Sequence, residues 1–512
     1  MRSRKAFYNA FSALLVQIVT VVCGFIVPKL QIGHFGSEIH GMVSSIGQFL
    51  GYITLVEAGV GGVTRAALYG PLANRDTAKI SGILKATERF FRAIAFSFCG
   101  YTLLVALGFS LFNESGTSFA FMFSLVIIVS LGTFIQYFFG ITNAILLNAD
   151  QKAYIHCTLR IITAILHLVV VYLLIRMDFS LHAVKLFSAL VFMIVPFYMY
   201  VYVKRQYRVD HRCPPDNEAI KQRWNGLGQH IAYFLHTHTD VVVLTLFTNF
   251  IEVSVYSVHY MVASGIERIA LIFSNGFEAA FGEMLARNEM NALRRSFRIY
   301  ELISSSVVVI LFTTAGLLIN PFVQLYTRGV TDANYHRVLF AYILLLSEAV
   351  YCIRQPYHTL IMAAGHFKQT QGFAFLEAGT NIVLSVLLVT RYGVVGVAVG
   401  TLVAMTLRTI LIADYLKREI LYRNFSLFAI RQIVTAANAG VIIGAVKLIF
   451  PSLTFDSYLG FAAYGAMIVG ISVCATLLFS FCFYRQDARD AINMILGLFR
   501  GKKARARRSE IA

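Results

Sequence analysis

The sequence predicts an all-α polytopic membrane protein with about 14 transmembrane helices. Three observations support this: the composition, the spacing of the apolar runs, and the distribution of basic residues. The chain has 512 residues, of which 58% are hydrophobic and 14% charged, with a mean hydropathy of +0.69. Soluble domains carry about 25% charged residues. So much apolar surface indicates that lipid is the solvent.

Apolar runs recur along the whole chain. Crossing about 30 Å of hydrocarbon takes about 20 residues in a helix. The run after the basic start Met1–Lys5 is too long for the apolar core of a signal peptide, so we expect an uncleaved first helix. We predict spans at 8–29, 41–63, 93–113, 119–143, 156–176, 181–203, 229–249, 254–278, 299–320, 338–362, 371–390, 394–415, 432–450 and 459–484.

Basic residues are distributed unevenly between the two sides that these spans define. With the N-terminus inside, 33 of the 44 Lys and Arg residues lie in inner segments and 7 in outer ones. Positively charged loops stay in the cytoplasm. We therefore predict a multi-pass protein of the cell membrane with both termini cytoplasmic. The net charge of +18 then needs no nucleic-acid partner.

The chain is predicted to divide into two lobes. The inner loop at 204–228 contains Pro214-Pro215 and reads as a linker. Met42–Ile46 weakly resembles Met261–Ile266, which indicates a repeat. The predicted parts are an N-terminal six-helix lobe at 1–203, the linker at 204–228, a C-terminal six-helix lobe at 229–415, two additional helices at 416–484, and a basic cytoplasmic tail at 485–512. The tail suits an interfacial helix, with a disordered tail as the alternative.

Several motifs of enzymes and ATPases are absent from the sequence. It contains no phosphate-binding P-loop, no HExxH and no GxSxG. The seven cysteines show no CxxC spacing, so we expect neither a disulfide framework nor a metal site. We predict a transporter without a cofactor and not an enzyme. Its energy would come from an ion gradient, the membrane potential or consumption of the product.

Arginines inside spans are costly and require an explanation, at about 2.5–3.5 kcal/mol each. They lie in the inner half of the predicted membrane, where guanidinium groups could hold an anionic diphosphate. For Arg65, Arg160 and Arg408 the alternative is that the side chain extends to the interface. For Arg268 and Arg354 it is a structural ion pair. The predicted cationic substrate site is Arg65, Arg354, Arg268, Arg160 and Arg408.

Acidic residues in spans form a second set of candidates. Asp240 is the deepest, and His236 shares its helix face at a spacing of four residues. A proton or monovalent cation could bind there, and a polar face without titration is the alternative. Gly59, after Glu57, permits close packing or a local helix break. The predicted coupling residues are Asp240, His236, Glu57 and Glu267.

Four segments resemble a known family. They are Phe35–Ile39 with Ser44–Tyr52, Glu57–Gly62, Leu325–Tyr335 and Ala364–Gln371. They are similar to segments of the multidrug/oligosaccharidyl-lipid/polysaccharide (MOP) exporter superfamily, in its Wzx-type polysaccharide flippase branch. The resemblance covers helices one to twelve. It implies two six-helix, MATE-like lobes around a central cavity, lined by helices one, two, seven and eight, which places Arg65 and Asp240 at the cavity.

The resemblance implies alternating access that moves a polyprenyl-diphosphate-linked oligosaccharide from the inner to the outer leaflet. It also implies a monomer that works beside polysaccharide assembly proteins. A drug/cation antiporter of the same superfamily is the first alternative. A membrane-embedded glycan-modifying enzyme is the second, and the short predicted outer loops argue against it.

Overall fold

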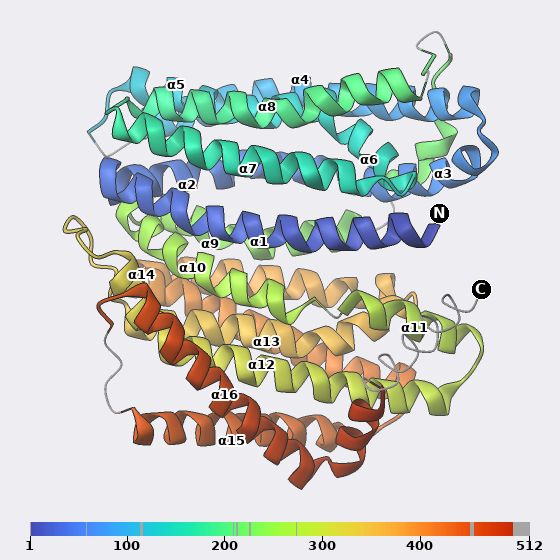
Figure 1. Cartoon of the computed structure of the whole chain (residues 1–512), viewed down its shortest axis with the longest axis vertical. Coiled ribbons are helices and arrows are strands. Elements are labelled where there is room, and N and C mark those ends of the chain that lie inside the picture. The colour runs from blue at the N-terminus through green and yellow to red at the C-terminus, as the bar shows by residue number, and fades with distance from the viewer. Residues whose placement is uncertain are drawn as a thin grey trace, which may run out of the picture. The chain divides into compact units, whose positions relative to one another are not determined.

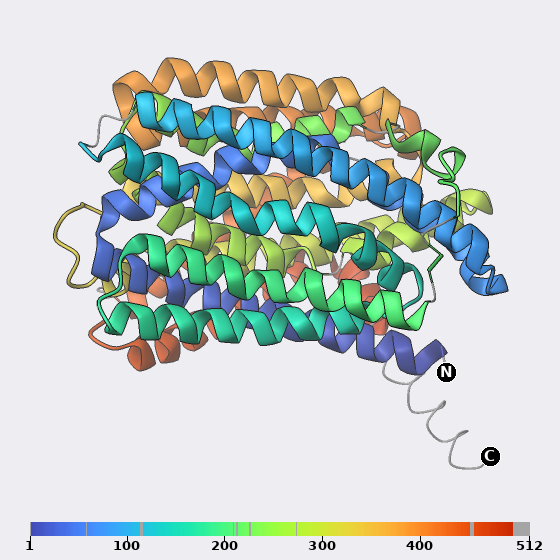
Figure 2. The same cartoon turned by 90° about the horizontal axis from the view of Figure 1, so that it is seen from above.

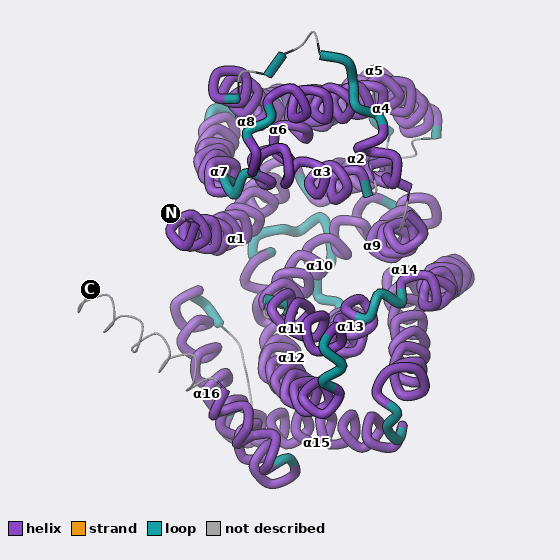
Figure 3. Tube along the Cα trace, turned by 90° about the vertical axis from the view of Figure 1, so that its right-hand side faces the viewer, coloured by secondary structure: helices purple, strands orange, loops and turns teal. Residues whose placement is uncertain are grey.

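The computed structural model describes residues 2–57, 59–112, 116–207, 209–210, 213–224, 227–272, 274–450 and 455–494. All regular structure in these residues is helical, and Figure 3 shows only helices and loops there. By internal contacts the chain forms two compact units. Unit 1 is Met1–Ser257 with Gly329–Ala333, and unit 2 is Val258–Arg328 with Asn334–Ala512. The predicted lobes divide earlier, at 204–228, and that division stays a prediction.

Unit 1 contains nine α-helices and the start of α10. Helix α7 packs between α1 and α8. Helix α4 packs on α5, and α3 packs on α6 (Figures 1 and 2). The bounds are α1 Arg2–Phe35, α2 Ser37–Gly51, η1 Tyr52–Glu57, α3 Val60–Asn74, α4 Thr77–Leu111, α5 Phe119–Ile135, η2 Gln136–Gly140, α6 Ile141–Ala149, α7 Ala153–Arg176, α8 Leu181–Gln206, η3 Glu218–Trp224, α9 Leu227–Phe247 and α10 Phe250–Ala270.

Unit 2 contains the rest of α10 and the last helices. Here α13 packs on α12 and α14, and α12 also contacts α15 and α16, the two red helices in Figure 1. The bounds are α11 Ser274–Ala286, α12 Met290–Tyr326, α13 Val338–Ala363, α14 Phe367–Leu416, η4 Lys417–Leu421, α15 Phe425–Ile449 and α16 Tyr458–Phe483. Residues 485–494 form one more helical segment.

The membrane class follows from where apolar side chains lie. Eleven helical stretches of the described residues are long and apolar enough to cross a membrane. Large apolar side chains such as Leu104, Leu387 and Ile433 are 65–69% exposed, as expected where lipid replaces water. The chain is thus an all-helical, multi-pass membrane protein, as predicted.

Every predicted span overlaps a helix, and two of the fourteen share α14. That helix is two helices joined at Gly393, whose φ of 54° and ψ of −133° are not helical. The predicted spans at 229–249 and 254–278 correspond to α9 and α10, which are not among the eleven. The prediction of about 14 spans therefore agrees with the helices present.

Three predicted spans are not single α-helices. The one at 254–278 runs past the end of α10 at Ala270 and into α11, which begins at Ser274. The one at 41–63 is interrupted by the 3₁₀-helix η1 and by Gly59, whose φ of 88° is in the left-handed region. Glycine adopts this conformation at no steric cost. The one at 119–143 contains the five-residue π-helix η2. The interruptions at η1 and η2 lie in unit 1.

Helix starts are fixed by short polar side chains. Asp76 accepts a hydrogen bond from the Lys79 amide at 3.0 Å and begins α4. Ser118 and Ser457 do the same for α5 and α16, at 3.3 Å and 3.2 Å. Such caps satisfy amide groups that lack a partner within the helix.

Candidate functional site

Three charged side chains meet in the interior of unit 2. Arg354 of α13 donates from Nη1 to Glu377 Oε1 of α14 at 2.6 Å, and Arg408 of α14 donates from Nη1 to Glu377 Oε2. Arg354 is 2% exposed, Glu377 1% and Arg408 7%. The Arg354 guanidinium also lies over the Tyr351 ring, 4.9 Å from its centre. The structure thus brings two of the five predicted arginines together on one carboxylate.

The three side chains carry a net charge of +1. A buried ion pair needs a close partner because desolvation of each charge is costly. The contacts of Arg354 agree with the alternative named for it in the sequence analysis, a structural ion pair. Arg408 does not extend to an interface, since it is buried and paired. Both arginines can shape the local potential, but Glu377 already occupies one nitrogen of each.

The other three predicted arginines are exposed. Arg65 on α3 and Arg160 on α7 belong to unit 1, and Arg268 on α10 belongs to unit 2. Within the described part of the chain none of them makes an ion pair. Their guanidinium donors therefore remain available for an anionic ligand.

Asp240 is the best-placed carboxylate of unit 1. It is 3% exposed, and its Oδ2 accepts a hydrogen bond from the Tyr256 hydroxyl of α10 at 2.9 Å. His238, two residues earlier, contacts the Gln48 side chain of α2 and stacks on Phe234 at 4.0 Å between ring centres. The side chain of His236 lies outside the described residues, so its predicted pairing with Asp240 stays a prediction.

The remaining two predicted carboxylates are half-buried and lie in different units. Glu57 ends η1 in unit 1 and lies within hydrogen-bonding reach of Tyr137 of η2. Glu267 on α10, in unit 2, interacts electrostatically with Arg268 and with Cys352 of α13. Neither lies in the arginine cluster around Glu377.

The sequence interpretation missed a second charged cluster in unit 2. Glu301 of α12 is 4% exposed and accepts hydrogen bonds from Arg423, Arg431 and the Tyr357 hydroxyl. Burial of Arg423 lowers its pKa, but the hydrogen bond and charge of Glu301 outweigh this effect and raise it. The available signal was a carboxylate at the start of a predicted span, together with two arginines in one later loop, between the predicted spans 394–415 and 432–450.

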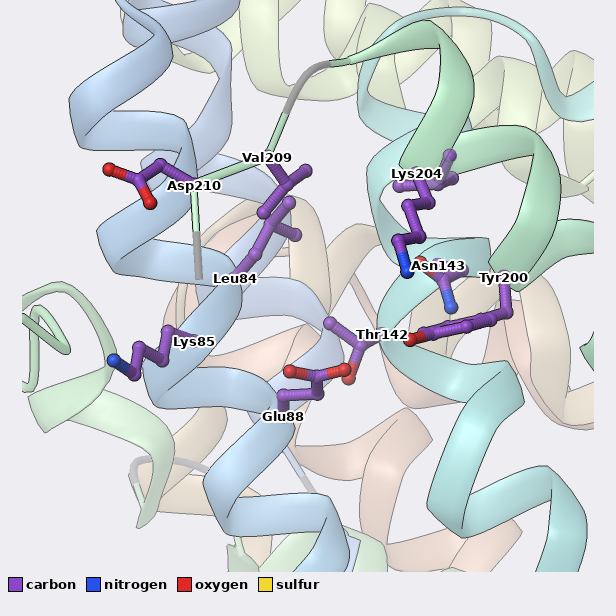
Figure 4. A pocket seen from close by; sticks show the side chains of 10 residues that line it. Leu84, Lys85, Glu88, Thr142, Asn143, Tyr200, Lys204, Val209 and Asp210 are labelled. Atoms are coloured by element: carbon purple, nitrogen blue, oxygen red, sulfur yellow. The ribbon is translucent and has the colours of Figure 1, made fainter. Parts of the chain in front are cut away.

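A pocket lies in unit 1, and none of the predicted site residues lines it (Figure 4). Its empty space is about 430 Å³, including the part open to solvent. Lys204 and Tyr200 of α8 and Glu88 of α4 point into it. The lining residues are Leu84, Lys85, Glu88, Thr142, Asn143, Tyr200, Val203, Lys204, Val209 and Asp210.

Metal ligation finds no support in the described residues, which contain no group of three or more His, Cys, Asp or Glu side chains placed to hold a metal ion. All seven cysteines are free thiols. The chemistry of the described residues is therefore that of buried arginine–carboxylate pairs, exposed guanidinium groups and further buried carboxylates such as Asp240.

The helices and their order define a class: polytopic membrane proteins with the fold of MurJ and the MATE transporters. The chain is similar to a solved structure described as lipid II flippase MurJ in an inward closed conformation. The TM-score is 0.65 at 14% sequence identity, covering 93% of this chain and 98% of that one.

Two further solved structures belong to MATE transporters. An inward-facing multidrug resistance MATE family transporter of the MOP superfamily gives a TM-score of 0.63 at 15% identity, covering 80% of this chain and 99% of that one. The Vibrio cholerae MATE transporter VcmN, in its bent form, gives 0.53 at 15% identity, covering 82% and 99%. At these identities the likeness shows the fold. No protein-family model matches the sequence, and no curated protein sequence matches it.

Proposed function

We propose that the protein is a flippase that moves a polyprenyl-diphosphate-linked oligosaccharide, a precursor of a cell-surface polysaccharide, from the inner to the outer leaflet by alternating access. The observation that carries this proposal is the extent of the likeness to the MurJ structure. It spans 93% of this chain, whereas the two MATE structures described above span 80% and 82%, and that of the eukaryotic MATE transporter AtDTX14 spans 85%. The additional part of this chain that the MurJ match covers, relative to those two MATE matches, is about as long as the stretch 425–483, which holds α15 and α16.

The exposed arginines support a role in holding the diphosphate. Arg65, Arg160 and Arg268 have no ion-pair partner among the described residues, and planar guanidinium groups bind phosphate oxygens in pairs. Arg354 and Arg408 take a different part in this proposal. They add a net positive charge through the cluster at Glu377 rather than contacting the cargo.

Coupling to a proton or monovalent cation is proposed for Asp240, with His236, Glu57 and Glu267 as further candidates. Asp240 supports this because it is buried on a helix and accepts a hydrogen bond from the Tyr256 hydroxyl. Ionisable groups in such places commonly belong to ion pathways.

The second candidate function is a drug/cation antiporter, which the MATE likeness favours. The solved structures that share the fold are transporters by name, so the glycan-modifying enzyme gains no support from them. A monomer in the cytoplasmic membrane, with both termini inside and polysaccharide assembly proteins nearby, completes the proposal.

A leaflet assay in proteoliposomes tests the function. A fluorescent polyprenyl-diphosphate oligosaccharide is quenched from outside, with and without an ion gradient. We expect movement between leaflets that Arg65→Gln and Arg268→Gln slow. Arg391→Gln, which changes an exposed arginine outside the proposed site, is the matched control. No movement by folded protein, together with drug efflux from the same vesicles, would establish the antiporter instead.

A further inference from the structure

A short helix after α16 is attached to unit 2 by its two carboxylates. This C-terminal arm comprises residues 485–494. Asp490 accepts two hydrogen bonds from Arg295 of α12, from Nε at 2.9 Å and from Nη2 at 2.6 Å. Asp487 accepts from Arg298 Nε at 3.2 Å and from Arg431 Nη2 of α15 at 3.3 Å. Each acid of the arm therefore faces arginines of other elements.

The arm's partners belong to a cluster of four arginines, here called the arginine basin. Arg295, Arg298 and Arg431 bind the arm, and Arg423 joins them through Glu301. One carboxylate, Glu301, is shared by two of them. It binds Arg431 at 2.7 Å and Arg423 through both oxygens at 3.0 Å and 2.8 Å. Without the arm the basin carries four positive charges and one negative charge. With Asp487 and Asp490 in place the net charge is +1.

We infer that the arginine basin is a binding site for the phosphate of an anionic phospholipid headgroup, and that Asp487 and Asp490 of the arm occupy this site in the present structure. The same guanidinium nitrogens that bind these carboxylates would bind phosphate oxygens. Arginine forks match both groups through paired N–H donors. The side chains of Arg431 and Glu301 are 7% and 4% exposed, so this part of the site is buried and held in place by its own ion pair.

The arm is the replaceable part of this arrangement. Its buried apolar side chains are small, Ala488 and Ala491. Two of its arginine partners are substantially exposed, Arg295 at 62% and Arg298 at 46%. The pairs of Asp490 with Arg295 and of Asp487 with Arg298 reach solvent through their arginines, which limits the stability they add. The pair of Asp487 with Arg431 is buried. Segments with few apolar contacts open locally at low cost. An anion at the basin would therefore compete with the arm for the same donors.

The distribution of basic residues indicates that a lipid is the source of the phosphate. All four basin arginines lie in segments that the excess of Lys and Arg assigns to the inner side. Anionic headgroups of the inner leaflet attract such clusters beside membrane helices. The inference does not rest on the proposed transport activity.

The first test measures lipid binding to the full chain. Native mass spectrometry counts phosphatidylglycerol and phosphatidylcholine bound to purified protein. We expect preference for phosphatidylglycerol. Asp487→Asn with Asp490→Asn should strengthen this binding roughly threefold to tenfold, because neutral amides replace the competing carboxylates. Arg295→Gln with Arg298→Gln should weaken it by a similar factor.

Two matched controls lie in the same unit. Arg294→Gln removes an exposed charge from α12 beside the basin, and Asp456→Asn neutralises an exposed acid paired with Arg328. Neither should change the lipid preference. Unchanged binding in both double variants would overturn the inference. Displacement of phosphatidylglycerol by millimolar inorganic phosphate would overturn the lipid assignment in favour of free phosphate.

A second readout follows the arm itself. Ala491→Cys, on a background without the native cysteines, places a thiol at a buried position of the arm. We expect maleimide to label it faster in phosphatidylglycerol nanodiscs than in phosphatidylcholine nanodiscs. Equal labelling rates in both lipids would show that the headgroup does not displace the arm from the arginine basin, and would refute the inferred competition between the two.

Discussion

The backbone of α2 at Gly41 touches the backbone of α10 at Phe250. A Cβ atom at Gly41 would lie 1.6 Å from the Phe250 carbonyl oxygen and 2.6 Å from its carbonyl carbon. One residue earlier, His40 Nδ1 lies 2.8 Å from the Ser254 hydroxyl. Small residues allow membrane helices to approach this closely. The contact fixes the start of α2 against α10 inside unit 1.

Gly41→Ala should therefore destabilise unit 1 strongly. The added methyl group meets backbone, which cannot rotate away, so we expect a cost at or above the upper end of the ~1–3 kcal/mol typical of overpacking. Thermal unfolding in detergent measures it. Gly47→Ala on the same helix has open space and serves as the control. An unchanged melting temperature for Gly41→Ala would contradict the close contact.

Glu377→Gln should destabilise unit 2. It leaves two buried arginines without their shared carboxylate, and removing one partner of a buried ion pair costs about 3–5 kcal/mol. Glu283→Gln breaks an exposed pair with Arg287, both 64% exposed, which is worth at most about 1 kcal/mol. Denaturant unfolding compares the two variants. Equal stabilities would mean that Arg354 and Arg408 do not depend on Glu377.

The docking of the arm should depend on pH through Asp490. The hydrogen bond from Arg295 lowers the pKa of Asp490 below its ordinary value of 3.8. The docked Asp490 carboxyl thus binds fewer protons than the carboxyl of an undocked arm. The ionised carboxylate therefore favours docking at pH values above 3.8. This stabilisation disappears as the pH falls through the lowered pKa. A spin label at Asn493→Cys should become more mobile in that range, and in Asp490→Asn this contribution to the change should be absent.

Asp240→Asn should uncouple transport from the ion gradient. The amide keeps the shape and can still accept from Tyr256, but it can neither hold a proton nor carry a charge. In the leaflet assay we expect movement that no longer responds to pH or cation gradients. Tyr256→Phe removes only the donor and should shift the response rather than abolish it. A gradient response equal to that of the unchanged protein would remove Asp240 from the coupling proposal.

The positions of the membrane helices were predictable because apolar runs of about 20 residues are a strong local signal. The break before α3 was open to prediction as well, since Gly59 follows Glu57 and glycine tolerates a left-handed backbone. The π-helix η2 was not, because its residues Gln136–Gly140 differ in no evident way from an ordinary helical turn.

Ion-pair partners were less predictable than charges. The sequence indicated that Arg354, Glu377 and Arg408 lie within spans, but their pairing depends on which faces of α13 and α14 meet. The cluster at Glu301 was missed because its partners Arg423 and Arg431 lie more than 120 residues away. Likewise, Tyr256 meets Asp240 because α9 and α10 bring them together.

The π-helix η2 also has a consequence for comparing this chain with distant relatives. A π-helical turn holds one residue more than the α-helical turn that it replaces. A relative with an uninterrupted α-helix in this place would therefore lack one residue between Ile135 and Ile141. A correct alignment would then need a single-residue gap in the middle of a membrane span, where gaps are ordinarily penalised most. Without that gap, every residue of α6 would be matched to a neighbour about 100° away around the helix.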